Sequence, residues 1–339
     1  MSERAGRRRT LPPPSTPPFP RAVATWVGRV AELARGAQLM ASETLHLVYG
    51  VGGVGKSELV YKLVEEAMRQ PRWADAAAVV LVARPNTGAA HLAAALKSQL
   101  GARRKRITFS ATGGSAMDDL ADIAQALEAK PHIVFLDDLH HLDPREAAEV
   151  LGYLSRHVRE SRVIAASRVE LTLPADAPPP VVHRLGPLDA SATAALVRQV
   201  AARLGVAAPD AAQVFRRSGG SPFYVLRELA GDAGKDGGLD DTVRALSDDA
   251  RRLLLVLAST RGRLSAGDAQ TLGGPSGVDV LRALTRQLLV DTSRGTAMVH
   301  DLVRDAVYRL ASRRDRSAAH RQLAELHLSH AGDGTRPPT

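Results

Sequence analysis

The sequence predicts an α/β fold with a parallel sheet, followed by two largely helical parts. A glycine-rich turn at residues 50–57 separates a short apolar run from an amphipathic one, as between a strand and a helix. A second short apolar run, residues 132–136, is followed by two aspartates. Beyond residue 189 the apolar positions recur at helical spacing, with one hairpin pattern near residues 289–299. Strands that alternate with helices in the first half favour a parallel sheet.

Composition limits the classes of protein that fit. The 339 residues are enough for about two or three domains, and 45% apolar and 24% charged content is typical of a globular protein. The absence of cysteine excludes disulfides, thiol nucleophiles and zinc sites built on cysteine. We find no apolar run long enough to cross a bilayer and no apolar secretory segment, so we expect a cytoplasmic protein without membrane contact.

The chain is basic, with a formal net charge of +9 and an isoelectric point near 10.3. This charge is compatible with nucleic acid or another acidic partner, but a solvated arginine surface accounts for it equally well. Residues 1–21 join an arginine cluster to a proline-rich run, which predicts an extended, disordered tail. The basic run Arg103–Arg106 is predicted to be a solvated loop, with nucleic-acid contact as the alternative.

A helix is predicted to begin near Trp26–Leu33 and to lead to the strand Leu45–Tyr49. The turn that follows has the spacing of a phosphate-binding P-loop, GVGGVGKS. Glycines let the backbone wrap a phosphate with its N–H groups pointing inward, at the positive end of the next helix. We therefore predict a nucleoside triphosphate site, in which Lys56 binds the β- and γ-phosphates and Ser57 ligates Mg²⁺. The other residues of the predicted loop are Gly50, Gly52, Gly53, Val54 and Gly55.

The apolar run His132–Leu136 predicts a buried parallel strand that ends in Asp137 and Asp138. Ligands of open α/β sheets bind at the carboxyl ends of the strands. Asp137 is predicted to bind Mg²⁺, directly or through water, and Asp138 to polarise the attacking water. The neighbouring His140 and His141 are predicted to be loop or helix-cap residues, because no cluster of metal-ligating side chains accompanies them.

A later strand, Arg162–Ala166, ends in Ser167 and Arg168. Arginine at this edge fits a sensor of the γ-phosphate, and a surface arginine at a strand end is the alternative. Two more strands are predicted at Ala78–Ala83 and Val181–Leu185. Two helices are predicted at Ala89–Leu100 and Met117–Ala129.

The second half is predicted to be mainly helical. Pro222 is placed at the first turn of a helix, after two glycines. The segment Gly231–Gly238 is a predicted linker. Three helices and the hairpin Leu289–Val299 then form the parts of a winged helix, before His300, Asp301 and helices to about Ser329. The helices are predicted at Asp189–Leu204, Asp210–Arg217, Ser247–Leu257, Ala266–Leu272 and Val278–Leu288.

These elements predict six segments. They are a tail (1–21), a P-loop nucleotide-binding domain (22–186), a helical lid domain (187–237), a winged-helix domain (238–312), a C-terminal helix (313–330) and a polar tail (331–339).

The motif series resembles the STAND class of AAA+-related signal-transduction ATPases, which includes large ATP-binding bacterial transcription regulators. The resemblance spans roughly Trp26 to Leu328. It depends on the order and spacing of motifs whose sequences are VGR at 27–29, the P-loop, FLDDLH at 135–140, SR at 167–168, LGPL at 185–188, GGSPF at 219–223 and MVHD at 298–301. The class implies a P-loop NTPase core with a parallel sheet, a helical lid and a winged helix.

The resemblance also implies roles for single residues. Val27 and Arg29 would lie by the adenine, and Pro222 would pack on the base. Lys56, Asp137, Asp138 and Arg168 would be the catalytic group. His300 would reach the β-phosphate of ADP and hold a closed state; a histidine that serves only the exit of the hairpin is the alternative.

Two departures from the class stand out. Val299 separates Met298 from His300, whereas the usual motif is Met-His-Asp. Large members also carry sensor repeats and an effector domain, so the chain is either a compact member or the core of a longer protein.

Two functions are compatible with the sequence. The first is an ATP- and ADP-binding switch that hydrolyses ATP slowly with Mg²⁺ and opens and self-associates in signal transduction or transcription regulation, with unidentified protein effectors or sensors. The second is an initiator- or loader-like AAA+ ATPase whose winged helix binds DNA through basic residues such as Arg282, Arg286 and Arg294.

Overall fold

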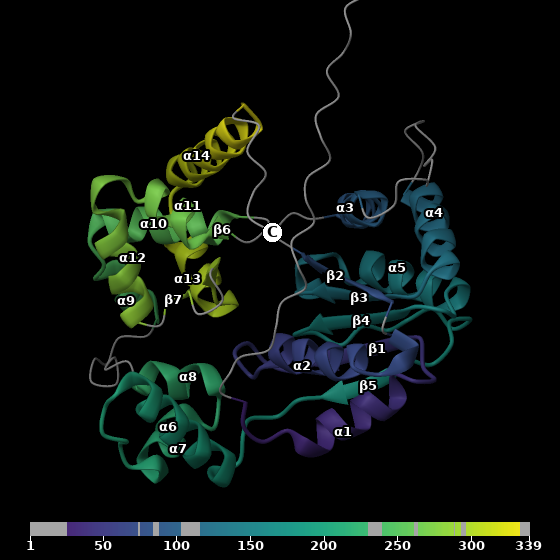
Figure 1. Ribbon diagram of the computed structural model, residues 1–339, viewed down its shortest axis with the longest axis horizontal. Coiled ribbons are helices and arrows are strands. Elements are labelled where there is room, and N and C mark those ends of the chain that lie inside the picture. Colours follow the sequence, from purple (N-terminus) through teal and green to yellow (C-terminus); the bar gives the residue numbers. More distant parts are fainter. Residues whose placement is uncertain are drawn as a thin grey trace, which may run out of the picture.

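The computed structural model describes residues 26–73, 75–83, 88–102, 116–229, 239–260, 264–287, 289–292 and 296–332. Five of the predicted features lie outside these residues: the N-terminal tail, the basic run Arg103–Arg106, the linker Gly231–Gly238, Arg294 in the hairpin turn, and the polar tail from residue 333. Figure 1 shows a sheet with helices on the right, a group of helices at the lower left, and a helical group with a small sheet at the upper left.

A five-stranded parallel sheet has the order β2-β3-β4-β1-β5. The central strands β1, β3 and β4 are buried at every position, because helices cover both of their faces. In the register of β1 and β4, Tyr49 lies opposite Ser167, so the turns after these two strands are neighbours. The strands are β1 (Leu45–Tyr49), β2 (Ala77–Val82), β3 (His132–Asp137), β4 (Arg162–Ser167) and β5 (Val181–Arg184).

Two layers of helices pack on this sheet (Figure 1). Alternate residues of each strand face opposite layers, and the buried side chains separate accordingly into two apolar clusters. One layer is α1 (Val30–Leu39) and α2 (Lys56–Met68); the other is α3 (Ala89–Ala102), α4 (Ala116–Ala129) and α5 (Pro144–His157). We call this part, β1–β5 with α1–α5, the α/β region.

Two elements of the α/β region differ from the prediction. Helix α1 begins at Val30, four residues after Trp26, because Gly28 and Arg29 have φ values of +64° and +58°. Helix α5 was missed, although Asp143 caps its first turn and Pro144 stands at its first position. The Asp143 carboxylate accepts hydrogen bonds from the backbone N–H groups of Arg145 and Glu146.

Three helices follow, and we call them the middle helical region: α6 (Ala190–Leu204), α7 (Ala211–Ser218) and α8 (Pro222–Arg227). The carboxylates of Asp189 and Asp210 cap α6 and α7 by accepting hydrogen bonds from backbone N–H groups. Gly205 and Gly219 end the same two helices in left-handed conformations. These caps explain why both helices were predicted close to their observed bounds.

The C-terminal region comprises residues 239–332 and has its own apolar core. Three helices lie where they were predicted, and β8 pairs antiparallel with both β7 and β6. Strand β6 and helix α9 were not predicted from the sequence. The elements are α9 (Leu239–Arg244), α10 (Asp248–Ser259), β6 (Leu264–Ser265), α11 (Ala266–Leu272), α12 (Gly277–Arg286), β7 (Val290–Asp291), β8 (Thr296–Val299), α13 (Asp301–Leu310) and α14 (Arg313–Gly332). Within the described residues, no helix combines the length and the apolar character needed to span a bilayer.

Candidate nucleotide site

The P-loop lies between β1 and α2, as predicted. Gly53 and Gly55 have φ values of +79° and +98°, a conformation that glycine adopts at little cost, and Gly55 directly precedes α2. Lys56 is 7% exposed, and its Nζ donates to the carbonyl oxygens of Gly50 at 2.9 Å and Val51 at 3.2 Å. The ammonium group therefore lies within the curve of the loop, where a phosphate chain would be bound.

Ser57 and the two aspartates meet at the carboxyl edge of the sheet. The Ser57 hydroxyl donates to Oδ2 of Asp137 at 2.7 Å, and the backbone N–H of Asp138 donates to Oδ1 of the same carboxylate at 2.9 Å. Asp137 and Asp138 are 4% and 2% exposed. Asp138 has a φ of +58°, so the chain turns sharply away from the sheet at this residue.

Arg168 follows β4 and reaches the same edge. An ideal Cβ added to Gly52 would lie 3.4 Å from the Arg168 guanidinium carbon, so the arginine lies beside the P-loop. Its Nη2 lies 2.7 Å from Oδ2 of Asp305 on α13, and both side chains are one-quarter exposed. This contact is an ion pair without hydrogen-bond alignment. The structure therefore brings Lys56, Asp137, Asp138 and Arg168 to one place.

Arg29 makes contacts that the sequence did not indicate. Its Nη2 donates to the backbone oxygen of Val54 at 3.0 Å and to that of Gly186 at 2.6 Å. The guanidinium thus ties the P-loop to the segment after β5. Val27 packs on the apolar cluster of the middle helical region.

The start of α8 lies against the P-loop. The Phe223 N–H donates to the Gly53 oxygen at 3.3 Å, and the Ser221 hydroxyl donates to the same oxygen at 3.4 Å. A Cβ on Gly53 would lie 2.8 Å from the Phe223 Cβ, so there is no room for a side chain at this glycine. Pro222 is therefore held next to the loop by both of its neighbours.

His300 directly precedes α13. Its Nδ1 accepts a hydrogen bond from the Leu302 N–H at 3.2 Å, and its ring lies 4.4 Å from the Phe223 ring, centroid to centroid. Because Phe223 also contacts Gly53, the histidine is linked to the P-loop through this phenylalanine. Both a role for His300 as a helix cap and a role near phosphate are compatible with these contacts.

Sequence analysis missed two residues of α13 that contact the site. Leu302 lies so close to Gly52 that an added Cβ would be 2.6 Å from its Cδ2, and Asp305 pairs with Arg168. Residues 302 and 305 are three apart and share one helix face, which faces the α/β region here. That spacing was visible in the sequence, but nothing local showed what the face would meet.

A further histidine, His140, lies in the short turn η2 (Leu139–His141) directly after Asp138. Burial lowers its pKa to about 4; the neighbouring His141 and the positive charges of Arg168 and Lys56 act in the same direction, while Asp305 opposes them. The ring is therefore neutral at pH 7.

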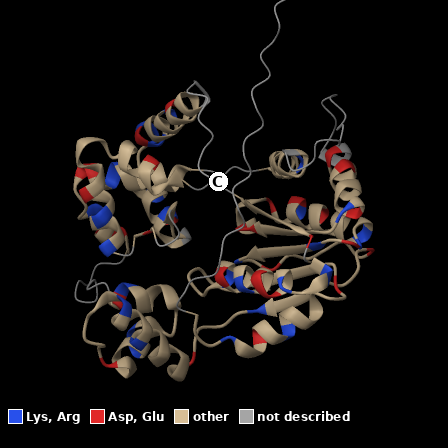
Figure 2. Cartoon of the chain, viewed as in Figure 1, with Lys and Arg blue, Asp and Glu red and all other residues tan. Residues whose placement is uncertain are grey.

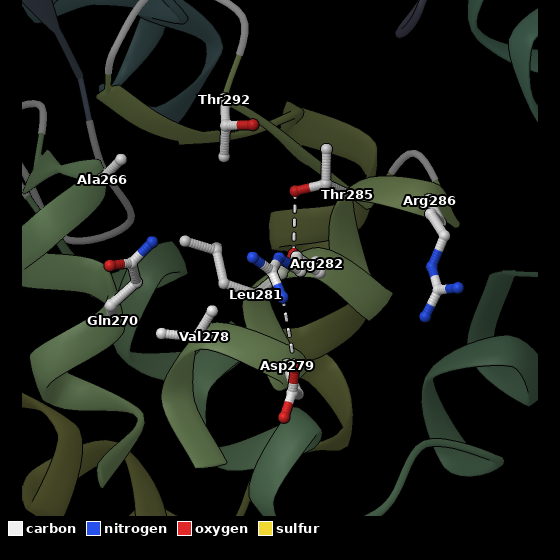
Figure 3. Close-up of a pocket in the computed structure, with 9 residues that line it drawn as sticks. All are labelled: Ala266, Gln270, Val278, Asp279, Leu281, Arg282, Thr285, Arg286 and Thr292. Atoms are coloured by element: carbon white, nitrogen blue, oxygen red, sulfur yellow. Dashed lines mark hydrogen bonds and ion pairs between the residues drawn. The ribbon is translucent and has the colours of Figure 1, made fainter. Parts of the chain in front are cut away.

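A separate cavity of about 720 Å³ lies in the C-terminal region, among side chains of α11, α12 and Thr292 (Figure 3). Within it, Arg282 points toward Asp279, 3.5 Å away, and Arg286 extends away from the other labelled side chains. The P-loop residues do not line this cavity, so it is distinct from the nucleotide site.

Comparison with known proteins gives a family match for the first half of the chain. The family model described as the AAA ATPase domain matches residues 25–167. These residues contain the P-loop, Asp137, Asp138 and all of β4. No curated protein sequence is significantly similar to this chain.

Three solved structures are similar in fold. The signal transduction ATPase with numerous domains (STAND) from Pyrococcus horikoshii, which has a tetratricopeptide repeat sensor, is 19% identical with a TM-score of 0.65. That match covers 92% of this chain and 46% of that chain, so this chain spans just under half of that protein. The ORC1 protein of Aeropyrum pernix in complex with DNA is 17% identical with a TM-score of 0.49, over 84% of this chain and 93% of that chain.

The third similar structure is a Walker-type ATPase from Pyrococcus abyssi, 14% identical with a TM-score of 0.46, over 87% of this chain and 99% of that chain. Sequence identities this low show the fold alone. Residues 25–167 match the AAA ATPase domain, and the chain has a P-loop AAA+ fold similar to that of the STAND protein.

Proposed function

We propose that the chain is an ATP- and ADP-binding molecular switch of the STAND class, which acts in signal transduction or transcription regulation. ADP would hold the C-terminal region closed on the P-loop in a monomer. ATP would release that region and allow self-association, and slow hydrolysis would reset the closed state. Unidentified protein sensors and effectors would supply the trigger and the output.

The ion pair between Arg168 and Asp305 carries this proposal. Arg168 belongs to the catalytic edge of the sheet, whereas Asp305 belongs to the C-terminal region. Leu302, one turn before Asp305, contacts Gly52 of the P-loop itself. The C-terminal region therefore contacts the residues that would distinguish ATP from ADP. A two-state switch requires contacts whose strength differs between the ATP-bound and the ADP-bound state.

The competing ligands of Arg168 suggest how the switch would work. A guanidinium group binds a carboxylate or phosphate oxygens with the same planar set of donors. In the proposed closed state Asp305 is the partner of Arg168. A γ-phosphate would bind the Arg168 guanidinium in place of Asp305. This exchange would weaken the contact with α13 and free the C-terminal region. Hydrolysis removes the γ-phosphate, and the ion pair would form again.

Magnesium fits the proposed site. The Ser57 hydroxyl and the Asp137 carboxylate meet at 2.7 Å, and oxygens of this kind are the ligands that Mg²⁺ prefers. In the described part of the chain, no group of three or more histidine or acidic side chains forms a closed metal site. Ser57 and Asp137 would hold the ion, directly or through water, together with phosphate oxygens. Bound there, magnesium neutralises phosphate charge as the transition state forms.

The remaining assignments are part of the same proposal. Lys56 would bind the phosphates and Asp138 would polarise the attacking water. Val27 and Arg29 would border the adenine, and Pro222 would pack on it. His300 would stabilise the ADP state, and its contact with Phe223 gives it a route to the P-loop.

Light scattering on a sizing column tests the switch. The purified chain is run with ADP and then with a non-hydrolysable ATP analogue, with Mg²⁺ in both runs. We expect a monomer with ADP and a defined oligomer with the analogue. The same mass in both states, with nucleotide binding confirmed separately, would contradict the coupling of nucleotide to self-association.

A DNA-binding initiator- or loader-like ATPase is the second candidate. The order α10, β6, α11, α12, β7, β8 is compatible with a winged helix, in which α12 would be the helix that enters the major groove. Arg282 and Arg286 lie on α12. Against this, Arg282 is paired with Asp279, and both signs of charge occur in every region of the molecule in Figure 2.

Fluorescence anisotropy with duplex DNA over a series of salt concentrations separates the two candidates. A DNA-binding surface on α12 predicts that replacing Arg282 and Arg286 by alanine reduces the slope of log affinity against log salt by about 2, one unit per lost phosphate contact. No binding at low salt, or an unchanged slope in the double variant, would remove α12 as a DNA-binding surface.

A further inference from the structure

The side chain of His140 is one-tenth exposed and lies beside Asp138 of the catalytic group. Among the residues that the structure describes, neither of its ring nitrogens has a hydrogen-bond partner. Leaving buried polar atoms unsatisfied costs free energy, so such a group in a native protein needs an explanation. The prediction that His140 serves as a loop or cap residue does not supply one, because its ring caps no backbone group in this structure.

The turn that carries His140 is fixed from both sides. The His141 N–H donates to the Asp138 oxygen at 3.0 Å, and the Leu142 N–H donates to the Leu139 oxygen at 3.0 Å. Leu139 is 1% exposed and belongs to the core beneath the sheet edge. The ring of His140 also packs on that of His141, with 4.2 Å between the centroids. Its position is therefore set by the fold.

The ring points at the group that would activate water. Nδ1 of His140 lies 3.9 Å from Oδ1 of Asp138, just beyond hydrogen-bond distance. Lys56, Arg168 and Asp305 all lie close enough to act on the ring electrostatically. A neutral imidazole offers one donor and one acceptor, so it can bond to a carboxylate and to a water molecule at the same time.

We propose that His140 is a positioning residue for ATP hydrolysis, which holds the attacking water against Asp138. This inference rests on the proposed ATPase site and gives His140 a role there, since the motif series contains this residue but implies no role for it. One ring nitrogen donates to the Asp138 carboxylate, and the other accepts a hydrogen bond from the water. The water oxygen is then fixed beside the γ-phosphorus, and fixed geometry of this kind lowers the barrier without changing substrate affinity.

The chemical step is balanced without a further reactant. The water oxygen forms a bond to the γ-phosphorus, and the bond between that phosphorus and the β–γ bridging oxygen breaks. The electron pair of that bond stays on ADP. A proton of the water passes to Asp138 and from there to the phosphate product or to solvent. His140 gains and loses no proton overall.

The test compares His140→Ala and His140→Gln with the wild-type full chain. Nucleotide affinity is measured with fluorescent ATP and ADP analogues, and hydrolysis by phosphate release in single-turnover and steady-state form. For His140→Ala we expect kcat to fall at least about 10-fold, less than the roughly 100-fold or more of a direct acid or base because His140 acts through the water and Asp138. The Kd for ATP should stay within about threefold. Glutamine keeps a neutral donor and acceptor, so His140→Gln should recover part of the rate.

Two further variants make the test specific. His157→Ala, an exposed histidine on α5 whose ring lies against Tyr153, should leave kcat unchanged. In an Asp138→Asn background, His140→Ala should add little, because the two residues act on one water. The inference is overturned if His140→Ala hydrolyses ATP at the wild-type rate, if its effect is fully additive with that of Asp138→Asn, or if glutamine is no better than alanine.

The experiment distinguishes a loss of folding from a loss of hydrolysis. A thermal melt of each variant shows whether it is folded, and if His140→Ala is not, His140→Gln and His140→Asn carry the same comparison. If the wild-type chain itself neither binds nor hydrolyses ATP, the proposed function fails. If the wild type is active and the His140 variants match it, the function stands and this inference alone is lost.

Discussion

At the scale of single residues, Lys56 shows how the site is prepared for an anion. Its ammonium group is almost fully buried and is held by two carbonyl oxygens of its own loop. A phosphate chain placed in the loop would offer the same cation stronger, charged acceptors. The lysine therefore has a defined position within the loop.

We predict that Lys56→Ala weakens binding of both ATP and ADP by at least about 100-fold, since the cation that meets the phosphates is lost. Titration with fluorescent nucleotides measures the loss. Lys62→Ala is a matched control, because Lys62 lies on the same helix and pairs with Glu65 and Glu66 instead. Undiminished ATP affinity in Lys56→Ala would refute the P-loop assignment.

His300 has two candidate roles, a helix cap of α13 and a contact that stabilises the ADP state. It caps α13 and contacts Phe223, which in turn contacts Gly53. We predict that His300→Ala speeds dissociation of ADP about 10-fold, the kinetic equivalent of about 1.4 kcal/mol, and changes ATP affinity less than threefold. Stopped-flow displacement of fluorescent ADP gives the rate. Equal effects on ADP and ATP would assign His300 to helix capping alone.

At the scale of elements, strands β1 and β5 share a buried histidine pair. Nδ1 of His46 lies 3.2 Å from Nε2 of His183, and the rings are stacked 5.5 Å apart. Burial, and then the charge of His183, lowers the pKa of His46 from 6.5 to about 4, and burial also lowers the pKa of His183. The sheet therefore holds this pair in the neutral state.

This pair predicts acid sensitivity. The unfolded chain binds protons on these histidines more readily than the folded chain does. The free energy of unfolding is thus level above about pH 6.5 and falls as the pH drops toward 4. Between pH 6.5 and 5 we expect protonation of His46 alone to lower the free energy of unfolding by about 1.5 kcal/mol, since the slope reaches about 1.4 kcal/mol per pH unit only once the unfolded histidine is mostly protonated.

Urea unfolding curves at pH 7, 6 and 5 check this prediction. His46→Gln should flatten the pH dependence, and His157→Gln, at an exposed position, should leave it as in the wild type. An equally steep dependence in His46→Gln would show that other groups are responsible.

The elements also show which parts of the fold a sequence can predict. The strand, turn and helix around the P-loop were predicted almost to the residue, because glycine spacing and apolar periodicity are local signals. Strand β6 is two residues long and exists through its pairing with β8, so its stability is not local. Helix α5 does carry local signals in the sequence, namely Asp143 at its N-cap and Pro144 at its first position, although no helix was predicted there.

The residues of the candidate site also differ in whether a local sequence pattern predicts them. Lys56, Ser57, Asp137 and Arg168 follow from motif spacing, since parallel strands bring their carboxyl ends to one edge. Asp305 and Leu302 come from a different part of the chain. Their place at the site depends on how the C-terminal region packs on the α/β region, which no periodicity encodes. His140 was predicted from the sequence only as a loop or helix-cap residue, because its burial and the lack of hydrogen-bond partners for its ring nitrogens are visible only in the structure.

At the scale of the whole molecule, the Arg168–Asp305 ion pair should favour the closed state. We predict that Asp305→Asn, which keeps the shape and removes the charge, shifts the balance toward the open state by about fivefold, the equivalent of about 1 kcal/mol for a partly exposed pair. The concentration of ATP analogue needed for self-association should fall by a similar factor, as measured by light scattering.

Asp240→Asn is the matched control. Asp240 also pairs with an arginine of α13, Arg309, but both partners belong to the C-terminal region. The Asp240→Asn variant should leave the concentration of ATP analogue needed for self-association unchanged. If both variants respond alike, the effect comes from the stability of α13 and the competition between Asp305 and a γ-phosphate is refuted.

The measurement that tests the central claim most directly is the distance between the α/β region and the C-terminal region in each nucleotide state. The chain has no cysteine, so Glu149→Cys on α5 and Leu328→Cys on α14, both exposed positions, give a clean pair of dye sites for energy transfer. The account predicts one transfer efficiency with ADP and a clearly different one with a non-hydrolysable ATP analogue and Mg²⁺, and no response in Lys56→Ala. Identical efficiencies with ADP and the analogue, both shown to be bound, would contradict it.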